Sequence, residues 1–281
     1  MSFLWLTLLS ALRILRRNPL RAGLTMLGII IGIGAVVAMV SLGQGATASV
    51  QAEISSLGTN VLILVPGATT VGGVRGGLGS ISTLTVEDAE DIEKRVASVT
   101  AVMYATRSVL QVIRDNKNWS TIVLGTTPVF PDIRSWPIAE GNFFTQSDMD
   151  SAAKVVVLGK TAVQNLFEAG EEVVGSEIRI RNVSLRVIGV LAPKGQSITG
   201  QDQDDFVVLP FSTAERKVLG TKFLGTVGII LVATHTRHEI PAVADDIKDL
   251  LRTKHRLHQT EEDDFTIRTM EDIAKTIAGT S

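Results

Sequence analysis

The longest apolar stretch of the chain covers residues 22–42, and it contains no charged side chain. A helix of that length spans about 30 Å, which is the thickness of the hydrocarbon core of a bilayer. Apolar residues then continue to recur at intervals of four and three up to Gly58, a residue that commonly ends helices: Val50, Ile54 and Leu57. The pattern predicts a transmembrane helix and an extramembrane stalk over residues 20–58.

A shorter amphipathic segment precedes this stretch. Residues 2–17 place polar side chains three or four apart, and apolar ones fill the rest of the helical wheel. The polar positions are Thr7, Ser10, Arg13 and Arg17, and the apolar ones are Leu4, Trp5, Leu8, Leu12 and Leu15. Asn18-Pro19 breaks the pattern. We predict an amphipathic helix within residues 1–19 that either lies on the lipid surface or docks onto a cytoplasmic partner.

Beyond the stalk, strand and helix patterns alternate. Residues 60–65 read as a strand, residues 86–97 as a helix opened by Thr85 with Asp88 three residues later, and residues 102–114 as a strand. A loop with six glycines separates the first two, and we expect it to be mobile. The glycines are Gly67, Gly72, Gly73, Gly76, Gly77 and Gly79.

The same order recurs near the C-terminus. Residues 227–232 predict a strand, residues 239–255 a helix with Pro241 in its first turn, and residues 264–269 a strand. Two βαβ units of this kind resemble a split ferredoxin-like sandwich, so we assign the chain to the α+β class. The two halves of this porter-like domain are residues 59–115 and 225–275.

The segment between these halves, residues 116–224, predicts a smaller β-rich subdomain. Its strands are expected at 119–124, 154–158, 177–181, 184–190 and 206–209, with short helices at 161–167 and 212–219. The third and fourth strands form a hairpin around Asn182.

The charges place the N-terminus of the chain. Arg13, Arg16, Arg17 and Arg21 precede the apolar run, and no acidic residue occurs before Glu53. Clustered Arg marks the cytoplasmic end of a span, so the N-terminus is predicted inside and the main domain outside. The chain has 27 basic residues, these four included, against 29 acidic ones, so the remainder carries −6 and disfavours a nucleic-acid partner.

Two observations qualify the reading of the apolar helix. Ala46-Thr47-Ala48 resembles a signal-peptidase site, and a cleaved signal peptide is the alternative to an anchor. Small residues at Gly28, Gly32, Gly34 and Ala38 would permit close approach of a second helix, although Gly is also common in membrane helices generally.

Known chemical motifs are incomplete in this chain. Gly159-Lys160-Thr161 looks like the end of a phosphate-binding loop, but Lys154 replaces the first glycine. Residues 195–199 have Thr199 where a nucleophile elbow needs Gly. The chain has no Cys, which excludes disulfides. We therefore predict no catalytic residue, no directly bound cofactor and no metal site.

Two pairs of histidines and two acidic runs are the remaining candidate metal ligands in the sequence. His235 pairs with His238 and His255 with His258, but the neighbouring cations oppose a divalent ion. We expect these histidines, and the acidic runs 202–205 and 261–264, to be solvated surface. Weak calcium binding by the acidic runs is a remote alternative.

Several segments then carry a resemblance to a known family. Residues 16–32, read RRNPLRAGLTMLGIIIG, look like the first transmembrane segment of MacB-type ABC transporter permeases, in the wider FtsX-like group. Further segments similar to the family follow in family order: 136–143, 156–159, 166–167, 187–190, 194–195, 205–210 and 264–266. Departures are Asn142 in place of the usual Arg, and the lack of Gly after Phe167 and of Pro before Val174-Gly175.

This resemblance implies a permease subunit in a bacterial cell membrane. Family members carry three further spans and a coupling helix after the extracytoplasmic domain, and residues 276–281 would lead into the second span. The implied partners are an ABC ATPase that supplies ATP hydrolysis, a second permease copy, membrane lipid and, for export across two membranes, a periplasmic adaptor and an outer-membrane channel. A single-span anchored scaffold or sensor is the alternative, and an anchored enzyme has no motif in its favour.

Overall fold

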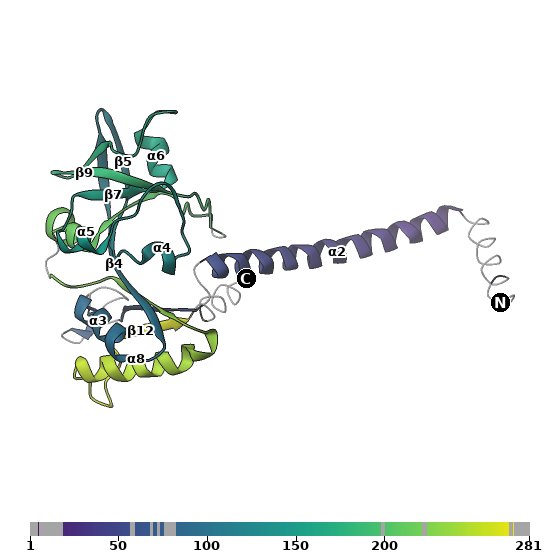
Figure 1. The fold of residues 1–281 in the computed structure, drawn as a ribbon. Helices are drawn as coiled ribbons and strands as arrows, with labels where there is room; N and C mark the ends of the chain where they lie inside the picture. Colours follow the sequence, from purple (N-terminus) through teal and green to yellow (C-terminus); the bar gives the residue numbers. More distant parts are fainter. Residues whose placement is uncertain are drawn as a thin grey trace. The chain divides into compact units, whose positions relative to one another are not determined.

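The computed structural model describes residues 5, 19–56, 60–67, 70–71, 74–75, 83–197, 200–220, 224–269 and 272 (Figure 1). It divides into two compact units, residues 1–52 and 53–281. Each unit is described by itself.

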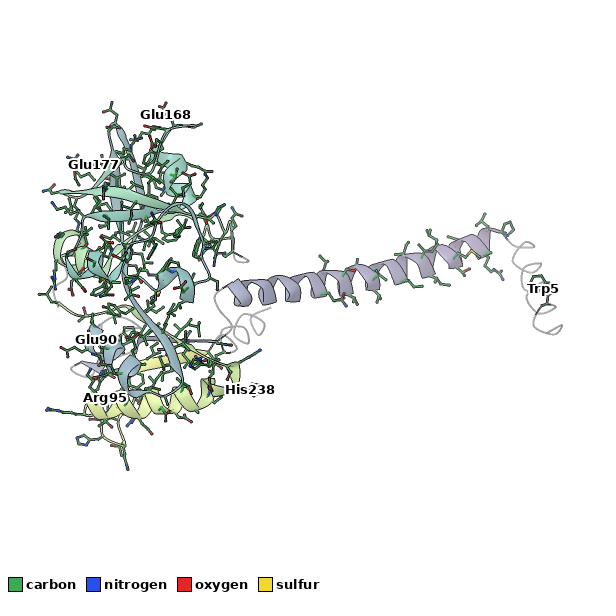
Figure 2. The ribbon with its side chains drawn as sticks, viewed as in Figure 1. Trp5, Glu90, Arg95, Glu168, Glu177 and His238 are labelled. Atoms are coloured by element: carbon green, nitrogen blue, oxygen red, sulfur yellow. The ribbon has the colours of Figure 1, made fainter. Side chains whose placement is uncertain are left out.

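Helix α2 spans Pro19–Ser56, a single helix of 38 residues. Its part from Pro19 to Gly45 has a mean hydropathy of 2.4 and buries none of its most apolar window, so it is long and apolar enough to cross a membrane. Large apolar side chains project from it all round (Figure 2), which a membrane span tolerates. The helix covers residues 20–56 of the predicted segment 20–58, and the division of that segment into a transmembrane helix and a stalk stays a prediction. The predicted helix at 2–17 lies outside the described residues except for Trp5, which is helical.

The second unit contains the predicted ferredoxin-like arrangement of two βαβ units. Strand β1 (Val61–Pro66), helix α3 (Val86–Arg95) and strand β4 (Val99–Arg114) form one βαβ unit, and β11 (Ile229–Thr234), α8 (Ile240–Lys254) and β12 (Phe265–Thr269) form the other. The strands pair in the order β12-β1-β11-β4, all antiparallel, so β1 runs parallel to β4 and β11 parallel to β12. This interleaved order is that of the split βαβ sandwich.

Local signals explain where the two helices begin. The Thr85 hydroxyl accepts a hydrogen bond from the Asp88 amide, and the Asp88 carboxylate accepts one from the Thr85 amide, which completes a capping box. Helix α8 has Pro241 in its first turn and follows the 3₁₀ turn Arg237–Glu239. The core on one sheet face joins these helices to strand residues, among them Leu62, Leu64, Val102, Ile230 and Val232.

The intervening segment is β-rich, as expected. Its strands are β5 (Lys117–Thr126), β6 (Ile138–Gly141), β7 (Val155–Leu158), β8 (Glu177–Ile180), β9 (Val183–Leu191) and β10 (Phe206–Pro210). Its helices are α4 (Phe130–Ile133), α5 (Gln146–Asp150), α6 (Lys160–Leu166), α7 (Phe211–Thr213) and the π-helical turn Ala214–Leu219. The sequence patterns did not indicate β6, α4 or α5, which are all short.

Hydrogen-bond pairing closes part of this segment into a ring. The order β4-β5-β10-β7-β9 continues through β8, which pairs with both β9 and the far end of β4. A ring leaves no free edges among its members. Its interior is an apolar core that includes Val112, Val123, Leu158, Leu185 and Leu209.

Strand β4 belongs to both parts of the sheet. From Val99 to Ala105 it pairs with β11, and from Ala105 to Arg114 it pairs with β5 (Figure 1). The subdomain boundaries at 115/116 and 224/225 stay a prediction. Of the glycine-rich loop, only Gly67 and the short pair β2 (Thr70–Val71) and β3 (Val74–Arg75) are described; its predicted mobility otherwise falls outside the described residues.

Candidate functional site

Helix α2 offers an open surface at its small residues. A Cβ atom built on Gly28, Gly32 or Gly34 would meet no atom within 4 Å, and Ala38 is exposed. A second helix could therefore approach this backbone closely. Arg21 is described at the start of the helix, and its carbonyl accepts a hydrogen bond from the Thr25 hydroxyl at 3.0 Å. Arg13, Arg16 and Arg17 lie outside the described residues.

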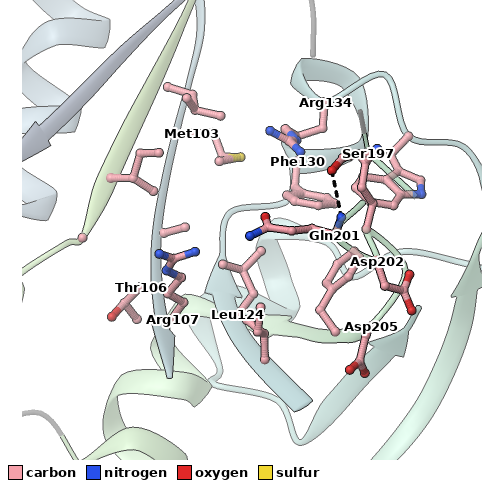
Figure 3. A pocket seen from close by; sticks show the side chains of 18 of the residues that line it. Met103, Thr106, Arg107, Leu124, Phe130, Arg134, Ser197, Gln201, Asp202 and Asp205 are labelled. Atoms are coloured by element: carbon pink, nitrogen blue, oxygen red, sulfur yellow. Dashed lines mark hydrogen bonds between the residues drawn. The ribbon is translucent and has the colours of Figure 1, made fainter. Parts of the chain in front are cut away.

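A cavity of about 610 Å³ opens between the ferredoxin-like strands and the segment that follows β5 (Figure 3). One wall is the sheet face opposite α3 and α8, where Met103, Ala105 and Leu231 point. The facing wall is aromatic and consists of Phe130, Trp136 and Phe206. We call this space the aromatic cavity. It exists because the alternating strands are apolar on both faces and only one face is covered by the two long helices.

The aromatic wall is held in a fixed geometry. Trp136 stacks on Phe130 at a centroid distance of 6.2 Å and meets Phe206 edge-on at 5.0 Å. The Trp136 indole N–H donates to the Ala192 carbonyl at 2.7 Å. Ser135, immediately before the tryptophan, has a φ of +45°, a left-handed conformation that non-glycine residues rarely adopt. The turn after α4 therefore aims the tryptophan and fixes it.

Two cations flank this tryptophan. The Lys194 ammonium lies 4.5 Å from the Trp136 ring centroid and donates to the Arg134 carbonyl at 2.8 Å. The Arg134 guanidinium lies 5.9 Å from the same ring and lines the cavity. Burial, with the charge of Arg134, lowers the pKa of Lys194 to about 8, and burial also lowers the pKa of Arg134.

The Arg134 guanidinium is unusual because its Nε is buried and has no hydrogen-bond partner. Among the described residues, Arg134 forms no ion pair with a carboxylate. Burying such a donor without a partner costs free energy. Within the part of the chain that the structure describes, the Arg134 Nε is therefore a buried donor that costs stability.

The acidic run at residues 202–205 is solvated only in part: Asp202 is exposed, as expected, whereas Asp204 and Asp205 are buried or half-buried. Asp204 is buried, and its carboxylate accepts hydrogen bonds from the amides of Lys194 and Gly195 at 2.8 and 2.9 Å. Asp205 accepts from the Trp119 indole at 2.8 Å, and Asp202 accepts from the Thr161 hydroxyl at 2.6 Å. The acids serve as hydrogen-bond acceptors that hold neighbouring loops together, a role that depends on partners distant in sequence.

The phosphate-loop resemblance also receives a packing explanation. A Cβ on Gly159 would lie 2.2 Å from the Asp204 carbonyl oxygen, so glycine is required by the close approach of two backbones. Thr161 uses its hydroxyl on Asp202, as above. The strand-to-helix transition predicted at this point is confirmed by β7 and α6.

His255 is likewise not solvated, which corrects our expectation for that residue. Its side chain is 12% exposed, its Nδ1 lies 2.9 Å from the Asp264 carboxylate, and its Nε2 lies 3.3 Å from Asp88. Lys254 adds contacts to Asp88 at 3.0 Å and to Asp91 at 2.6 Å. We call these five residues the carboxylate–histidine cluster. His235, His238 and His258 are exposed, as predicted; His238 is labelled in Figure 2.

The cluster shifts the pKa values of its members. Hydrogen bonds to Asp88 and Asp264 raise the pKa of His255 to about 9, against the opposing effect of burial. Burial alone would raise the pKa of Asp88, but hydrogen bonds from His255, Thr85 and Lys254 outweigh it and lower the pKa to about 2. In the second acidic run, residues 261–264, Asp263 forms ion pairs with Arg252 and, at 3.4 Å, with Lys248. Within the described residues, no group of His and acidic side chains is arranged to hold a metal ion.

Comparison with known proteins gives a consistent family. Residues 22–250 match the model of the MacB-like periplasmic core domain. A protein of Syntrophobacter fumaroxidans named macrolide export ATP-binding/permease protein MacB is 36% identical over 97% of this chain and 45% of its own length. One of the same name from Rhodospirillum rubrum is 38% identical over 86% of this chain and 36% of its own length. The chain thus spans less than half the length of these relatives.

Solved structures show the same fold. The periplasmic region of MacB from Actinobacillus actinomycetemcomitans superposes with a TM-score of 0.67 at 24% identity, over 83% of this chain and 99% of that one. The extracellular domain of the noncanonic ABC-type transporter YknZ from Gram-positive bacteria has a TM-score of 0.60 at 16% identity, over 75% of this chain and 100% of that one.

Proposed function

Because the chain belongs to the family of the MacB-like periplasmic core domain, we propose that it is the first membrane span and the extracytoplasmic domain of an ABC transporter permease. The observation that carries the proposal is the family match over residues 22–250, which includes both the apolar helix and the folded domain. In this proposal ATP binds to and is hydrolysed by an associated ATPase, and the extracytoplasmic domain moves in response. The chain itself performs no covalent chemistry.

We propose that α2 anchors the chain, with the N-terminus in the cytoplasm and the domain outside. Clustered Arg before the helix supports this orientation. The helix also continues without interruption through residues 46–48, where the alternative would place a signal-peptidase site. Its neighbours in the bilayer would be lipid and the spans of the permease.

Orientation can be tested cleanly because the chain contains no cysteine. A Ser10→Cys and a Ser184→Cys variant place one thiol each before the helix and on an exposed strand position of the domain. In spheroplasts, a membrane-impermeant maleimide should label Cys at 184 and leave Cys at 10 unlabelled until the cells are lysed. Labelling of position 10 in intact spheroplasts would contradict the orientation.

The partner proposal has its own test. We expect the full chain, purified from the membranes of its source in a mild detergent, to bring with it an ABC ATPase subunit or domain and ATP hydrolysis. A purified chain that carries neither, while remaining folded, would favour the single-span scaffold or sensor. Recovery of a periplasmic adaptor and an outer-membrane channel would assign it to export across two membranes.

We also propose that the small-residue face of α2 contacts the same helix in a second copy of the permease. Gly28→Leu and Gly32→Leu should reduce crosslinking between copies, because the larger side chains hold the backbones apart. Ile30→Leu, which lies between them and keeps a large side chain, is the matched control. Unchanged crosslinking in the glycine variants would remove the interface.

A further inference from the structure

The surface of the aromatic cavity that a ligand can reach is aliphatic. The three aromatic side chains of its wall are each less than a tenth exposed, so they offer little surface to a ligand. Ile122, in contrast, is 36% exposed, and Leu124 and Ile229 are half-buried. The volume of about 610 Å³ lies within the roughly 300–1,000 Å³ of small-molecule sites, which combine apolar walls with a few polar groups.

Two oppositely charged side chains line this cavity without pairing with each other. Arg107 is exposed and has no hydrogen-bond or ion-pair partner among the residues that the structure describes. Asp205 is half-buried; its Oδ1 accepts the Trp119 indole N–H at 2.8 Å, and no described donor bonds to its Oδ2. Asp202 differs, because both of its carboxylate oxygens accept hydrogen bonds within the fold.

The strand register places the two unpaired charges on opposite sides of β5. Arg107 of β4 lies directly opposite Leu124 of β5. Asp205 immediately precedes Phe206 of β10, which pairs with Ile122 of β5. Because β4 and β10 each lie about 4.8 Å from β5, the backbones that carry the two charges are about 10 Å apart. Figure 3 shows Arg107 and Asp205 on opposite sides of Leu124, so a ligand that reaches both charges crosses the aliphatic side chains of β5.

A ligand that matches this arrangement carries an anion and a cation at the two ends of an aliphatic body. A short apolar peptide with free termini has this form, because its carboxyl group is ionised and its amino group is mostly protonated at pH 7. Three extended residues span about 10 Å, which equals the separation of the two strands. The peptide carboxylate can form a bidentate pair with the Arg107 guanidinium, and the ammonium can donate to the open oxygen of Asp205.

We propose that the aromatic cavity binds a tripeptide with aliphatic side chains and free termini. The carboxylate lies on Arg107, the ammonium on Asp205, and the side chains on the aliphatic face of β5. The site goes beyond the permease proposal and does not depend on it, because all of its residues lie in the folded domain. Its failure would leave the family assignment and the permease proposal unchanged.

The experiment titrates trileucine into the full chain in lipid nanodiscs at pH 7 and measures heat by calorimetry, with empty nanodiscs as the blank. N-acetyl-trileucine, which lacks the ammonium, and trileucine amide, which lacks the carboxylate, are titrated in parallel. We expect saturable binding of one trileucine per chain. Each blocked peptide should bind about fivefold more weakly, because it loses one ion pair at the accessible rim of the cavity.

Two variants assign each end of the peptide to its partner. Arg107→Gln should weaken trileucine and the N-acetyl peptide about fivefold and leave the amide within about twofold, because the amide has no carboxylate to lose. Asp205→Asn keeps an oxygen for the Trp119 indole and removes the charge. It should weaken trileucine and the amide about fivefold and leave the N-acetyl peptide within about twofold.

Three further variants test the apolar contact and the effect of net charge. Ile122→Ser should weaken all three peptides, because it removes apolar surface that they share. Arg186→Gln and Glu177→Gln are the matched controls: each removes an exposed charge that does not line the cavity, and the affinity for trileucine should stay at the original level. Circular dichroism melting of each variant reports whether it is folded.

Several results would overturn the proposal. Absence of saturable trileucine binding to the folded original chain would remove the site, and equal affinity of the blocked peptides would remove the role of the two charges. An equal loss of trileucine and its amide in folded Arg107→Gln would place the carboxylate elsewhere. Equal losses in Arg107→Gln and Arg186→Gln, or in Asp205→Asn and Glu177→Gln, would show a general effect of net charge.

Discussion

The domain encloses charge in two places that differ in how the charge is balanced. In the carboxylate–histidine cluster, every cation faces a carboxylate: His255 contacts Asp88 and Asp264, and Lys254 contacts Asp88 and Asp91. In the aromatic cavity, Arg134 keeps a buried donor without a partner. In the first arrangement the buried charges compensate one another, whereas the second leaves a buried donor without a partner, which costs free energy.

The sequence origin of the two places also differs. The cluster joins the capping box of α3 to the end of α8, so residues that already have a local role acquire a second one. Arg134 follows a four-residue helix and precedes the left-handed Ser135, and among the described residues no carboxylate forms an ion pair with it. Substitutions at the two places should therefore act in opposite directions.

Asp88→Ala should have the largest effect on stability. It removes the N3 half of the α3 capping box and one of the two carboxylate partners of both Lys254 and His255, so we expect the free energy of unfolding to fall by about 3–4 kcal/mol. Urea denaturation followed by circular dichroism measures the change. Glu87→Ala, on the exposed neighbouring position, should stay within about 0.5 kcal/mol. A loss below about 1 kcal/mol for Asp88→Ala would contradict the role of the cluster.

Stability should depend on pH through His255. Its pKa of about 9 in the folded state lies above the unfolded value of about 6.5, so its stabilisation is complete below pH 6.5 and is lost as pH rises to 9. The expected loss is about 3 kcal/mol across this window. Urea denaturation at successive pH values measures it, and His255→Gln should remove the decline. An equally steep decline in that variant would assign the effect to another group.

Arg134→Met should have a smaller effect, and one of opposite sign to that of Asp88→Ala. Methionine keeps the apolar stem of the side chain and removes the unsatisfied buried donor, so we expect the free energy of unfolding to rise by about 1 kcal/mol. The midpoint of urea denaturation reports this, with Arg186→Met as the exposed control. A loss of more than about 1 kcal/mol would mean that the Arg134 guanidinium is already stabilised by its surroundings in the fold.

Lys194 should give stability a pH dependence of opposite sign to that of His255. Burial lowers its folded pKa to about 8, below the unfolded value of about 10.4, so the unfolded state binds more protons between pH 8 and 10. Stability should therefore rise with pH in this window once the opposing contribution of His255 is removed. Comparing His255→Gln with the double variant His255→Gln/Lys194→Met tests this, because only the single variant should show the rise.

The sequence alone determined the features that depend on neighbours along the chain. The uncharged run 22–42 predicted a helix long and apolar enough to cross a membrane, and α2 has that length and apolarity. Thr85 and Asp88 lie three residues apart, so the start of α3 followed directly. The alternation of strands and helices, with the family resemblance, gave the ferredoxin-like order.

The tertiary structure decided everything that joins distant segments. Closure of the ring depends on β8 meeting the far end of β4, the pairing of His255 with Asp88 depends on α8 packing beside α3, and the aromatic cavity needs β4 and β11 to face the turn after α4. None of these features leaves a periodic pattern in the sequence, because contacts between remote residues depend on how the faces of helices and sheets pack together. The acidic run 202–205 is an example. Its composition predicts a solvent-exposed loop, but in the fold its carboxylates accept hydrogen bonds from Trp119, Thr161 and Lys194.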